Sequence, residues 1–254
     1  MRSIYWHLEL SKVIVKHAQC RPTTPPVSGR EFPTDPFCFE HKLSGLPVFE
    51  LGEFERISTI LPAEMIEVVS GHKNAFGISE LMRNIDTCNA WMIFRNLEQI
   101  PAYKAIMEEV LEALIGELDL TNGYCLRPMC FAFVSSPFVR VPLHIDPEHN
   151  FLFQVFGSKS VYINHHGEDP ILSPTQIAGF YADEVGFSLS GTPVREENFQ
   201  KFHLTPSGGV YVPVTYPHFV TNDTSVSISF SVTFRSVCSD AHRMRHLKML
   251  QSAL

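Results

Sequence analysis

Residues 141–164 read VPLHIDPEHNFLFQVFGSKSVYIN, and this stretch is dense in aromatic and β-branched side chains. Such residues favour β-strands. Near its start, His144 and Asp146 stand two positions apart, and residues two apart in a strand point to the same face. We therefore expect both side chains to leave one strand on the same side. A second stretch of this kind, GGVYVPVTYPHFV at 208–220, supplies another histidine, His218.

Two histidines and one aspartate suit a metal site. Imidazole nitrogens and a carboxylate oxygen on one side of an ion leave positions open on the opposite side, as non-haem Fe(II) oxygenases require. We predict that His144, Asp146 and His218 are the metal ligands and form the catalytic centre. His149 falls outside the phase of that face, so we expect it to be structural.

The chain after the His-x-Asp pair is predicted to form a β-hairpin over residues 150–163. Gly157-Ser158 is a two-residue turn of the kind that closes hairpins. Pairing across that turn puts Asn150, Gln154 and Lys159 on one face, which we take to be the face of the metal ligands. A lone lysine is more often a solvated surface residue, but the turn geometry favours a place for Lys159 in the site.

The segment 144–159, HIDPEHNFLFQVFGSK, resembles the motif of the JmjC-type, cupin-like oxygenases that use Fe(II) and 2-oxoglutarate. It looks most like the branch that includes the asparaginyl hydroxylase acting on hypoxia-inducible factor. That branch has H-x-D, then an asparagine and a lysine at the positions that Asn150 and Lys159 occupy here. The second stretch resembles the strand that brings the family's last metal histidine. The similarity extends over residues 128–236.

The resemblance implies a fold and a division of the chain. The fold is mainly β with flanking helices, built as a double-stranded β-helix, which is a cupin or jelly-roll-like barrel. We expect an N-terminal extension with a Pro-rich linker, a mixed helical part that packs on the barrel, a JmjC/cupin-like catalytic core and a C-terminal helix, at 1–36, 37–127, 128–238 and 239–254.

The resemblance also implies an oxidoreductase, namely a 2-oxoglutarate-dependent dioxygenase. The three predicted ligands would hold Fe(II), with 2-oxoglutarate and O2 as co-substrates. Decarboxylation of 2-oxoglutarate to succinate and CO2 would accompany hydroxylation of a protein or peptide side chain, or of a small molecule. Lys159 would hold the distal carboxylate of 2-oxoglutarate, because a buried carboxylate needs a cation. Asn150 is expected beside it, and Ser229 is expected to contact the co-substrate.

This chain departs from the family pattern in two places. Relatives often have a threonine three residues before the first metal histidine, where it helps to hold the distal carboxylate. Val141 stands there in this chain, and Arg140, Ser229 or an upstream hydroxyl are the candidate replacements. Relatives also read Pro-Gly-Asp where this chain has Pro206-Ser207-Gly208. Because aspartate is a turn former at such positions, we expect a structural effect of its loss.

The stretch SVSISFSVTFR at 225–235 alternates between hydroxyl and apolar side chains. This is the pattern of a strand with one apolar face. The hydroxyl face would line the interior of a barrel that is covered by helices, or it would face water on a surface strand. The sequence leaves both possibilities open.

The best upstream strand candidate is NAWMIFRNL at 89–97, and an amphipathic helix, PAYKAIMEEVLEALIGELDL, is predicted at 101–120. Pro101 suits the first turn of that helix. The connector at 164–205 is long, and we expect it to lie over the mouth of the barrel. Its two adjacent histidines at 165–166 are expected to be surface residues.

A second helix is predicted at the C-terminus, SDAHRMRHLKMLQSAL at 239–254, with Ser239 or Asp240 as its N-cap. Its apolar stripe contains Met244 and Leu247. That stripe serves either a homodimer interface or packing on the same chain.

Composition fits a soluble enzyme, and a chain of 254 residues with 44% hydrophobic content can form one elaborate domain or one domain with an extension. The net charge of −7, with no basic stripe, argues against nucleic-acid binding, which depends on phosphate neutralisation. No apolar run approaches the ~20 residues of a membrane span, and the N-terminus lacks a signal-peptide layout. The six cysteines form no C-x-x-C pair, which indicates reduced thiols. We expect a cytoplasmic protein that binds neither nucleic acid nor membranes.

Two other classes of protein remain open. A non-redox cupin metalloenzyme could use the same ligands with zinc or manganese, although Lys159 would have no task there. A cupin-like metal-binding or regulatory module could keep the fold without oxygenase turnover, and Val141 leaves room for that reading.

Overall fold

The computed structural model describes residues 16–17, 35–70, 77–117, 125–164, 171–183, 187–189 and 195–253. Most of the predicted N-terminal extension lies outside these residues, as do the two histidines at 165–166. Of the extension, Lys16–His17 form a short strand, β1, which pairs with the edge of the main sheet.

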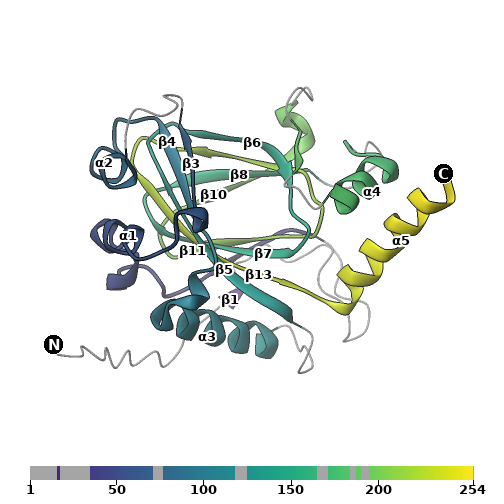
Figure 1. The fold of residues 1–254 in the computed structure, drawn as a ribbon, viewed down its shortest axis with the longest axis horizontal. Coiled ribbons are helices and arrows are strands. Elements are labelled where there is room, and N and C mark those ends of the chain that lie inside the picture. Colours follow the sequence, from purple (N-terminus) through teal and green to yellow (C-terminus); the bar gives the residue numbers. More distant parts are fainter. Residues whose placement is uncertain are drawn as a thin grey trace.

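Two antiparallel sheets face each other (Figure 1). The larger sheet runs in the order β1 (Lys16–His17), β2 (Phe37–Glu40), β11 (Gly208–Val212), β7 (His149–Phe156), β13 (Ser227–Arg235), β5 (Leu126–Ser135), β4 (Ala90–Phe94) and β3 (Ile66–Ser70). The smaller sheet runs in the order β10 (Phe199–Leu204), β8 (Lys159–Asn164), β12 (His218–Asn222), β6 (Arg140–Ile145) and β9 (Phe187–Ser188).

From β5 onward the chain winds between the two sheets. β5, β7, β11 and β13 lie side by side in the larger sheet, and β6, β8, β10 and β12 lie together in the smaller one. This interleaving is that of a double-stranded β-helix, so the predicted fold class is confirmed. β2, β3 and β4 extend the larger sheet beyond this eight-stranded framework.

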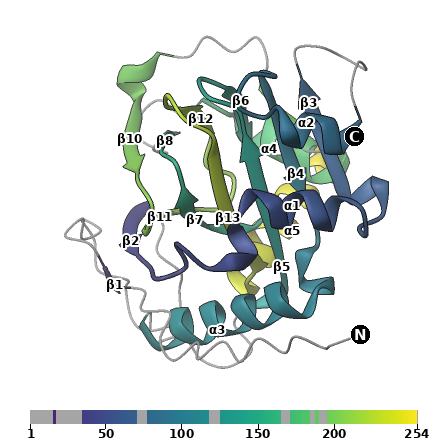
Figure 2. The same cartoon turned by 90° about the vertical axis from the view of Figure 1, so that its left-hand side faces the viewer.

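Helices cover the outer faces of both sheets (Figure 2). They are α1 (Leu51–Ser58), α2 (Ile78–Arg83), α3 (Pro101–Glu117), α4 (Pro174–Asp183) and α5 (Val237–Ala253), with 3-10 turns at Pro47–Phe49, Ala63–Met65, Leu97–Gln99 and Glu196–Asn198. The predicted strand at 89–97 appears as β4, and the predicted helix at 101–120 appears as α3. None of the helices in the described ranges has the length and apolar character that crossing a bilayer requires.

Three apolar clusters hold these layers together. One lies between the outer face of the larger sheet and α1, α2 and α3, and it includes Phe230 and Tyr103. A second lies between the outer face of the smaller sheet and α4 and α5, and it includes Tyr181 and Phe219. The third fills part of the interior between the two sheets, and it includes Val161. The metal-ligand candidates border this interior cluster.

The predicted hairpin at 150–163 is wrong. β7 pairs with β11 and β13 in the larger sheet, whereas β8 pairs with β10 and β12 in the smaller one. Gly157-Ser158 therefore carries the chain from one sheet to the other. A glycine turn between two strand-forming runs fits either connection, so local sequence alone does not distinguish them.

Two further expectations need correction. The C-terminal helix begins at Val237, and its cap is Ser236: the backbone N–H of Ser239 donates to Ser236 Oγ at 3.1 Å, and the N–H of Ser236 donates to Ser239 Oγ at 2.8 Å. The described part of the 164–205 connector lies mainly against the smaller sheet, where we expected it to cover the mouth of the barrel. α4 packs on the outer face of the smaller sheet beside α5, while β9 pairs with β6 next to His144.

Gly157 has a specific reason to be glycine. Its φ is +66°, and an added Cβ would lie 2.1 Å from the backbone oxygen of Val226. Left-handed backbone costs an L-residue about 1–2 kcal/mol, and the neighbouring backbone cannot easily move. Both effects act on the turn that leads into Lys159.

We therefore expect Gly157→Ala to lower the free energy of unfolding by more than about 2 kcal/mol, combining αL strain with the clash. Chemical denaturation measures it. Gly52→Ala is the matched control, because Gly52 lies in α1 with nothing within 4 Å of a built Cβ. An unchanged denaturation midpoint for Gly157→Ala would contradict the described turn.

Candidate metal centre

The three predicted ligands come together at one end of the barrel interior. His144 lies on β6 and His218 begins β12, and the two residues are directly opposite each other in the antiparallel pairing of these strands. Asp146 follows the end of β6, where its backbone oxygen accepts a hydrogen bond of 2.9 Å from the N–H of Thr215. The loop before β12 therefore fixes the chain at Asp146.

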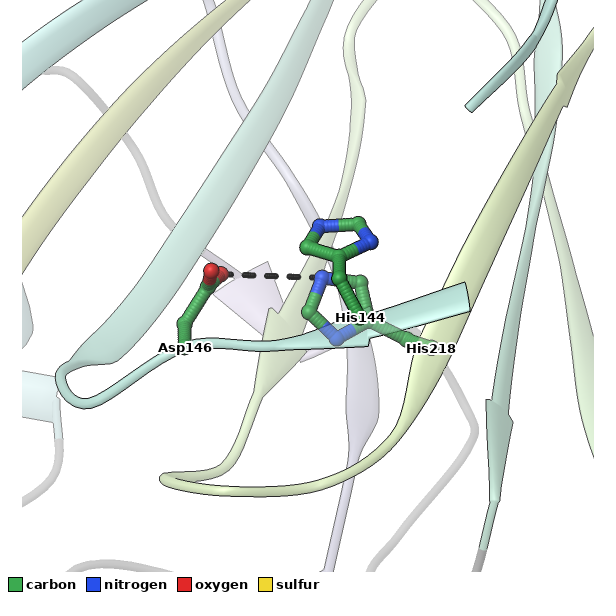
Figure 3. A group of neighbouring side chains, drawn as sticks. All are labelled: His144, Asp146 and His218. Atoms are coloured by element: carbon green, nitrogen blue, oxygen red, sulfur yellow. Dashed lines mark ion pairs between the residues drawn. The ribbon is translucent and has the colours of Figure 1, made fainter. Parts of the chain in front are cut away.

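The side chains converge (Figure 3). One potential ligand atom from each of His144, Asp146 and His218 lies within 4.8 Å of the other two. His218 Nε2 is 3.6 Å from Asp146 Oδ2, and the two imidazole ring centres are 4.1 Å apart. This spacing leaves room for one ion bound by two imidazoles and one carboxylate.

Both histidines present the same nitrogen to this site. His144 Nδ1 donates to the backbone oxygen of Pro142 at 2.8 Å, and His218 Nδ1 donates to that of Tyr216 at 2.9 Å. Each hydrogen bond places the ring proton on Nδ1, so the lone pair is on Nε2. Such bonds fix the tautomer and the ring orientation of metal-binding histidines.

The protonation states suit a cation. Burial, followed by the neighbouring His144, lowers the pKa of His218 to about 4. Burial alone would raise the pKa of the Asp146 carboxyl, but His218, His144 and the amide of Asn150 together bring it below its ordinary value. Near neutral pH the aspartate is thus ionised and His218 is neutral, which is the form that binds a metal.

A bulge in β6 sets which residues face inward. His218 is opposite His144 and Val220 is opposite Val141, so two steps along β12 correspond to three steps along β6. The extra residue lets both His144 and Val141 face the interior, where Val141 packs on the apolar cluster between the sheets. A β-bulge redirects side chains in this way.

Arg140, in contrast, does not face the interior. Its guanidinium lies 4.4 Å from the ring centre of Phe219, which belongs to the outer cluster under α4 and α5, and 3.8 Å from the Glu196 carboxylate. Arg140 therefore does not replace the threonine that relatives have at the position of Val141.

Lys159 is buried, with 4% of its surface exposed. It lies on the same face of β8 as Val161 and Ile163, which belong to the interior cluster, and Ile163 is opposite His218. Among the described residues, no charged or hydrogen-bonding group contributes to the pKa of its ammonium group. Burial lowers the pKa of Lys159 to about 7.

Asn150 connects the metal centre to β13. Its Nδ2 donates to Asp146 Oδ2 at 3.2 Å, and its Oδ1 accepts from the Ser231 hydroxyl at 2.6 Å. The structure thus gives Asn150 a contact with a metal-ligand candidate, whereas the sequence led us to expect it beside Lys159. Sequence reasoning missed Ser231, because its partner depends on the register of β13 with β7.

Ser229 forms part of a second polar group. Its hydroxyl donates to Gln154 Oε1 at 2.6 Å, so its single proton is already used within the protein. A carboxylate only accepts hydrogen bonds. In this geometry Ser229 has no proton left to donate to a bound carboxylate, and its contact with the co-substrate stays a prediction.

The hydroxyl face of β13 lies inside the barrel. Ser227, Ser229, Ser231 and Thr233 are buried, while the apolar residues between them pack on the outer cluster. The water-facing alternative for 225–235 is therefore wrong. Thr233 Oγ1 is buried and has no hydrogen-bond partner among the described residues.

His149 is structural, as its phase indicated. It faces away from the ligands, its Nδ1 is 2.8 Å from the Tyr211 hydroxyl, and its Nε2 is 3.0 Å from Ser236 Oγ. Burial lowers its pKa to about 3, so the ring is neutral. His149 therefore ties β7 to β11 and to the cap of α5.

Comparisons with known proteins agree with the fold. A structure of YcfD from Escherichia coli superposes with a TM-score of 0.55 at 13% sequence identity, covering 80% of this chain and 50% of that one. YcfD is described as a ribosomal oxygenase, and its structure in complex with cobalt and 2-oxoglutarate gives a TM-score of 0.52 at 16% identity, covering 84% of this chain and 54% of that one. This chain thus spans about half the length of the solved structures that it matches.

One curated protein shows a short sequence similarity. The Jumonji C domain-containing protein 5 of Drosophila melanogaster is 29% identical over 102 residues, which is 37% of this chain and 24% of that protein. No family model matches the chain.

The contact between Asn150 and Asp146 predicts a measurable effect on metal binding. We expect Asn150→Ala to weaken Co(II) binding by about 10–100-fold, as loss of groups that orient metal ligands typically does. Titration followed by the cobalt absorption spectrum measures it. Asn164→Ala is the control, because Asn164 is also buried but bonds Asn198 instead. Equal Co(II) affinities of the two variants would show that Asn150 does not orient Asp146.

Proposed function

We propose that this chain is a 2-oxoglutarate-dependent Fe(II) oxygenase that hydroxylates a second substrate. The observation that carries the proposal is a pairing of two features on one inner surface. Two histidines and one aspartate lie at one end of the barrel interior, and their potential ligand atoms converge on one point. A buried lysine without a partner among the described residues lies further along the same interior.

The residues fit iron. Two neutral imidazoles and one carboxylate form the three-ligand set of non-haem Fe(II) oxygenases, and they leave the other positions open. His144, Asp146 and His218 would hold the ion. When bound, Fe(II) supplies the redox chemistry by which O2 oxidises 2-oxoglutarate to succinate and CO2 and oxidises the second substrate.

Lys159 fits the far end of 2-oxoglutarate. It is four residues along β8 from Ile163, which is opposite His218, and at about 3.3 Å per residue the backbone separation is about 13 Å. A lysine side chain and a five-carbon dicarboxylate can share that length. The co-substrate would thus meet the metal with its keto acid and Lys159 with its distal carboxylate.

The surroundings strengthen such an ion pair. Leu152, Val161 and Val220 belong to the apolar cluster between the sheets. Charges attract more strongly in apolar surroundings than in water. A carboxylate would also remove the cost of an unpaired buried cation. Val141 adds an apolar contact where relatives have a threonine, so Lys159 carries more of the binding.

Protein or peptide side chains are the substrate class that we favour. The resemblance of HIDPEHNFLFQVFGSK to the branch with the asparaginyl hydroxylase supports this class. The fold match to a protein described as a ribosomal oxygenase is consistent with it. At 13–16% identity that match concerns the fold, so the activity rests on the residues of this chain.

The other two classes predict different behaviour. A non-redox cupin metalloenzyme has no use for a buried, unpartnered Lys159, and a binding module would keep its partner after loss of the metal ligands. Asp146→Ala separates these readings: it should abolish metal binding and turnover in an oxygenase, and leave partner binding intact in a module. Cytoplasmic location stays a prediction. A homodimer through α5, which lies beside α4 (Figure 1), is likewise a prediction. On α5, Met244 and Met249 are exposed, while Leu247 packs on the outer cluster of the smaller sheet.

Anaerobic titration with 2-oxoglutarate tests the proposal directly. In the Fe(II)-loaded protein we expect a weak visible charge-transfer band, which is lost in Asp146→Ala. In Lys159→Ala the affinity for 2-oxoglutarate should fall by about 10–100-fold, the equivalent of one hydrogen bond to a charged group. If iron is bound and no band appears, the keto acid does not chelate and the oxygenase proposal fails.

The burial of Lys159 predicts a dependence of stability on pH. The unfolded chain protonates this lysine below about pH 10.5, whereas in the folded protein its pKa is about 7. Folding is therefore increasingly opposed as the pH falls from about 10.5 to about 7. Lys159→Met removes that cost, and a tenfold change in proton affinity corresponds to about 1.4 kcal/mol.

Without co-substrate, we expect Lys159→Met to unfold at a higher temperature than the wild type at pH 7.5, by at least about 1.4 kcal/mol in unfolding free energy. The difference should shrink towards pH 10.5. Differential scanning calorimetry across this range measures it. Lys201→Met serves as the control, because Lys201 is exposed on β10. A difference that does not vary with pH would contradict a buried, unpaired ammonium group.

The preference for a protein substrate has its own test. Native lysate proteins incubated with the enzyme, Fe(II), 2-oxoglutarate and 18O2 should yield at least one peptide with a single incorporated 18O atom. The Asp146→Ala protein provides the background. If no peptide is labelled while 2-oxoglutarate is consumed, the substrate is a small molecule.

A further inference from the structure

We propose that Gln154 is a positioning residue for Lys159: its carboxamide holds the turn from which β8 starts, and so aims the lysine into the barrel interior. The inference rests on the proposed function for its consequence, which is the binding of 2-oxoglutarate. Its structural part concerns this chain alone.

The Gln154 amide is fully engaged and has no exposed surface. The two N–H protons of its Nε2 are shared among three acceptors, which are the backbone oxygen of Phe156 at 2.6 Å, that of Gly157 at 3.1 Å and Ser227 Oγ at 3.0 Å. Its Oε1 accepts from the Ser229 hydroxyl at 2.6 Å. Two of these contacts thus hold the turn, and two hold β13.

The backbone alone does not provide these contacts, because the β-ladder is irregular at this point. Ser229 is opposite Gln154 and Ile228 is opposite Phe156, so one step along β13 corresponds to two steps along β7. A bulge of this kind leaves ladder groups without their regular partners. The Gln154 side chain bonds the two backbone oxygens that follow the bulge.

The other side of the turn is held from a different loop. Ser158 Oγ donates to Asp223 Oδ2 at 2.5 Å, and the backbone N–H of Asp223 donates to the backbone oxygen of Ser158 at 3.2 Å. Gly157 packs against the backbone of Val226. β7 and β8 share no ladder, so these contacts and the Gln154 amide together fix the direction in which the chain enters β8.

The two backbone oxygens of the turn determine which way the amide faces, because they only accept hydrogen bonds whereas a serine hydroxyl can donate or accept. The NH2 group therefore faces the turn, Ser227 Oγ accepts from Nε2, and the Ser229 hydroxyl donates to Oε1. Reversal of the amide would place its oxygen against two backbone oxygens. The hydroxyls of β13 therefore contact different partners along the strand. Ser227 and Ser229 bond the Gln154 amide, whereas Ser231 bonds Asn150, which contacts Asp146 at the metal centre.

The test replaces Gln154 by methionine, which has similar length and no hydrogen-bonding amide. In Co(II)-loaded protein we expect the Kd for 2-oxoglutarate to rise at least tenfold, with the Kd for Co(II) unchanged. A merely structural loss would affect both or neither. Leu114→Ala is the control, because Leu114 lies on the buried face of α3 and its truncation should lower Tm to a similar extent. It should leave both dissociation constants unchanged.

Combination with Lys159→Ala gives the sharper result. If Gln154 acts through Lys159, Gln154→Met should have no further effect on 2-oxoglutarate affinity in the Lys159→Ala protein. Additive effects, or an unchanged Kd in Gln154→Met itself, would overturn the inference. Should Gln154→Met fold poorly, Ser227→Ala removes one contact to the amide and should raise the Kd by a smaller factor.

A second readout does not depend on 2-oxoglutarate. Brief acetylation with acetic anhydride, followed by peptide mass spectrometry, measures the access to Lys159. We expect slow labelling in the wild type and at least tenfold faster labelling in Gln154→Met, with Lys201 as internal reference. If the wild type binds no 2-oxoglutarate, the proposed function fails, and the labelling rates still decide the role of Gln154. Equal rates in both proteins would overturn it.

Discussion

The pairing of β12 with both β6 and β8 is the interaction on which the candidate site depends. It places His218 opposite His144 on one side and opposite Ile163 on the other. The first relation brings two imidazoles together, and the second fixes how far Lys159 lies from them. These residues are distant in sequence, so no local preference of the chain could set their distances. The double-stranded β-helix does so by placing successive strands of residues 126–235 alternately in the two sheets.

The interior between the sheets is divided between apolar and polar residues in an ordered way. Valine and leucine side chains fill one part, while the buried hydroxyls of β13 face the amides of β7. Each amide is satisfied within the protein and serves a different end of the site: Asn150 contacts Asp146, and Gln154 contacts the turn before Lys159. Buried polar groups that are satisfied in this way favour one arrangement of their surroundings. Thr233 Oγ1 is the exception among these hydroxyls, since it has no hydrogen-bond partner among the described residues.

Much of this could be predicted from the sequence, because the signals were local. The alternation at 225–235 indicated a strand with one apolar face, and the spacing of apolar residues indicated α3. The two-residue separation of His144 and Asp146 indicated a shared direction. The errors concern relations that a local pattern cannot carry. The Gly157 turn joins two sheets where a hairpin was expected, and the cap of α5 is Ser236 because its partner Ser239 reaches back to it. Lys159 does lie on the inner face, as expected. The cause is its register with β12, because β7 and β8 do not pair as a hairpin.

The bulge in β6 makes the metal centre sensitive to insertions and deletions in this segment. Residues before the bulge and residues after it alternate in opposite phases, so the number of residues between Val141 and His144 matters as much as their identity. Loss of one residue there would leave every ligand in the sequence and turn either Val141 or His144 towards the α4 side of the sheet. A substitution in this short segment changes one side chain and leaves the direction of the others unchanged. An insertion or deletion reverses the direction of every residue on one side of it. A length-based comparison of 140–146 is therefore a stricter guide to which related chains keep a working metal centre than a search for the His-x-Asp letters alone.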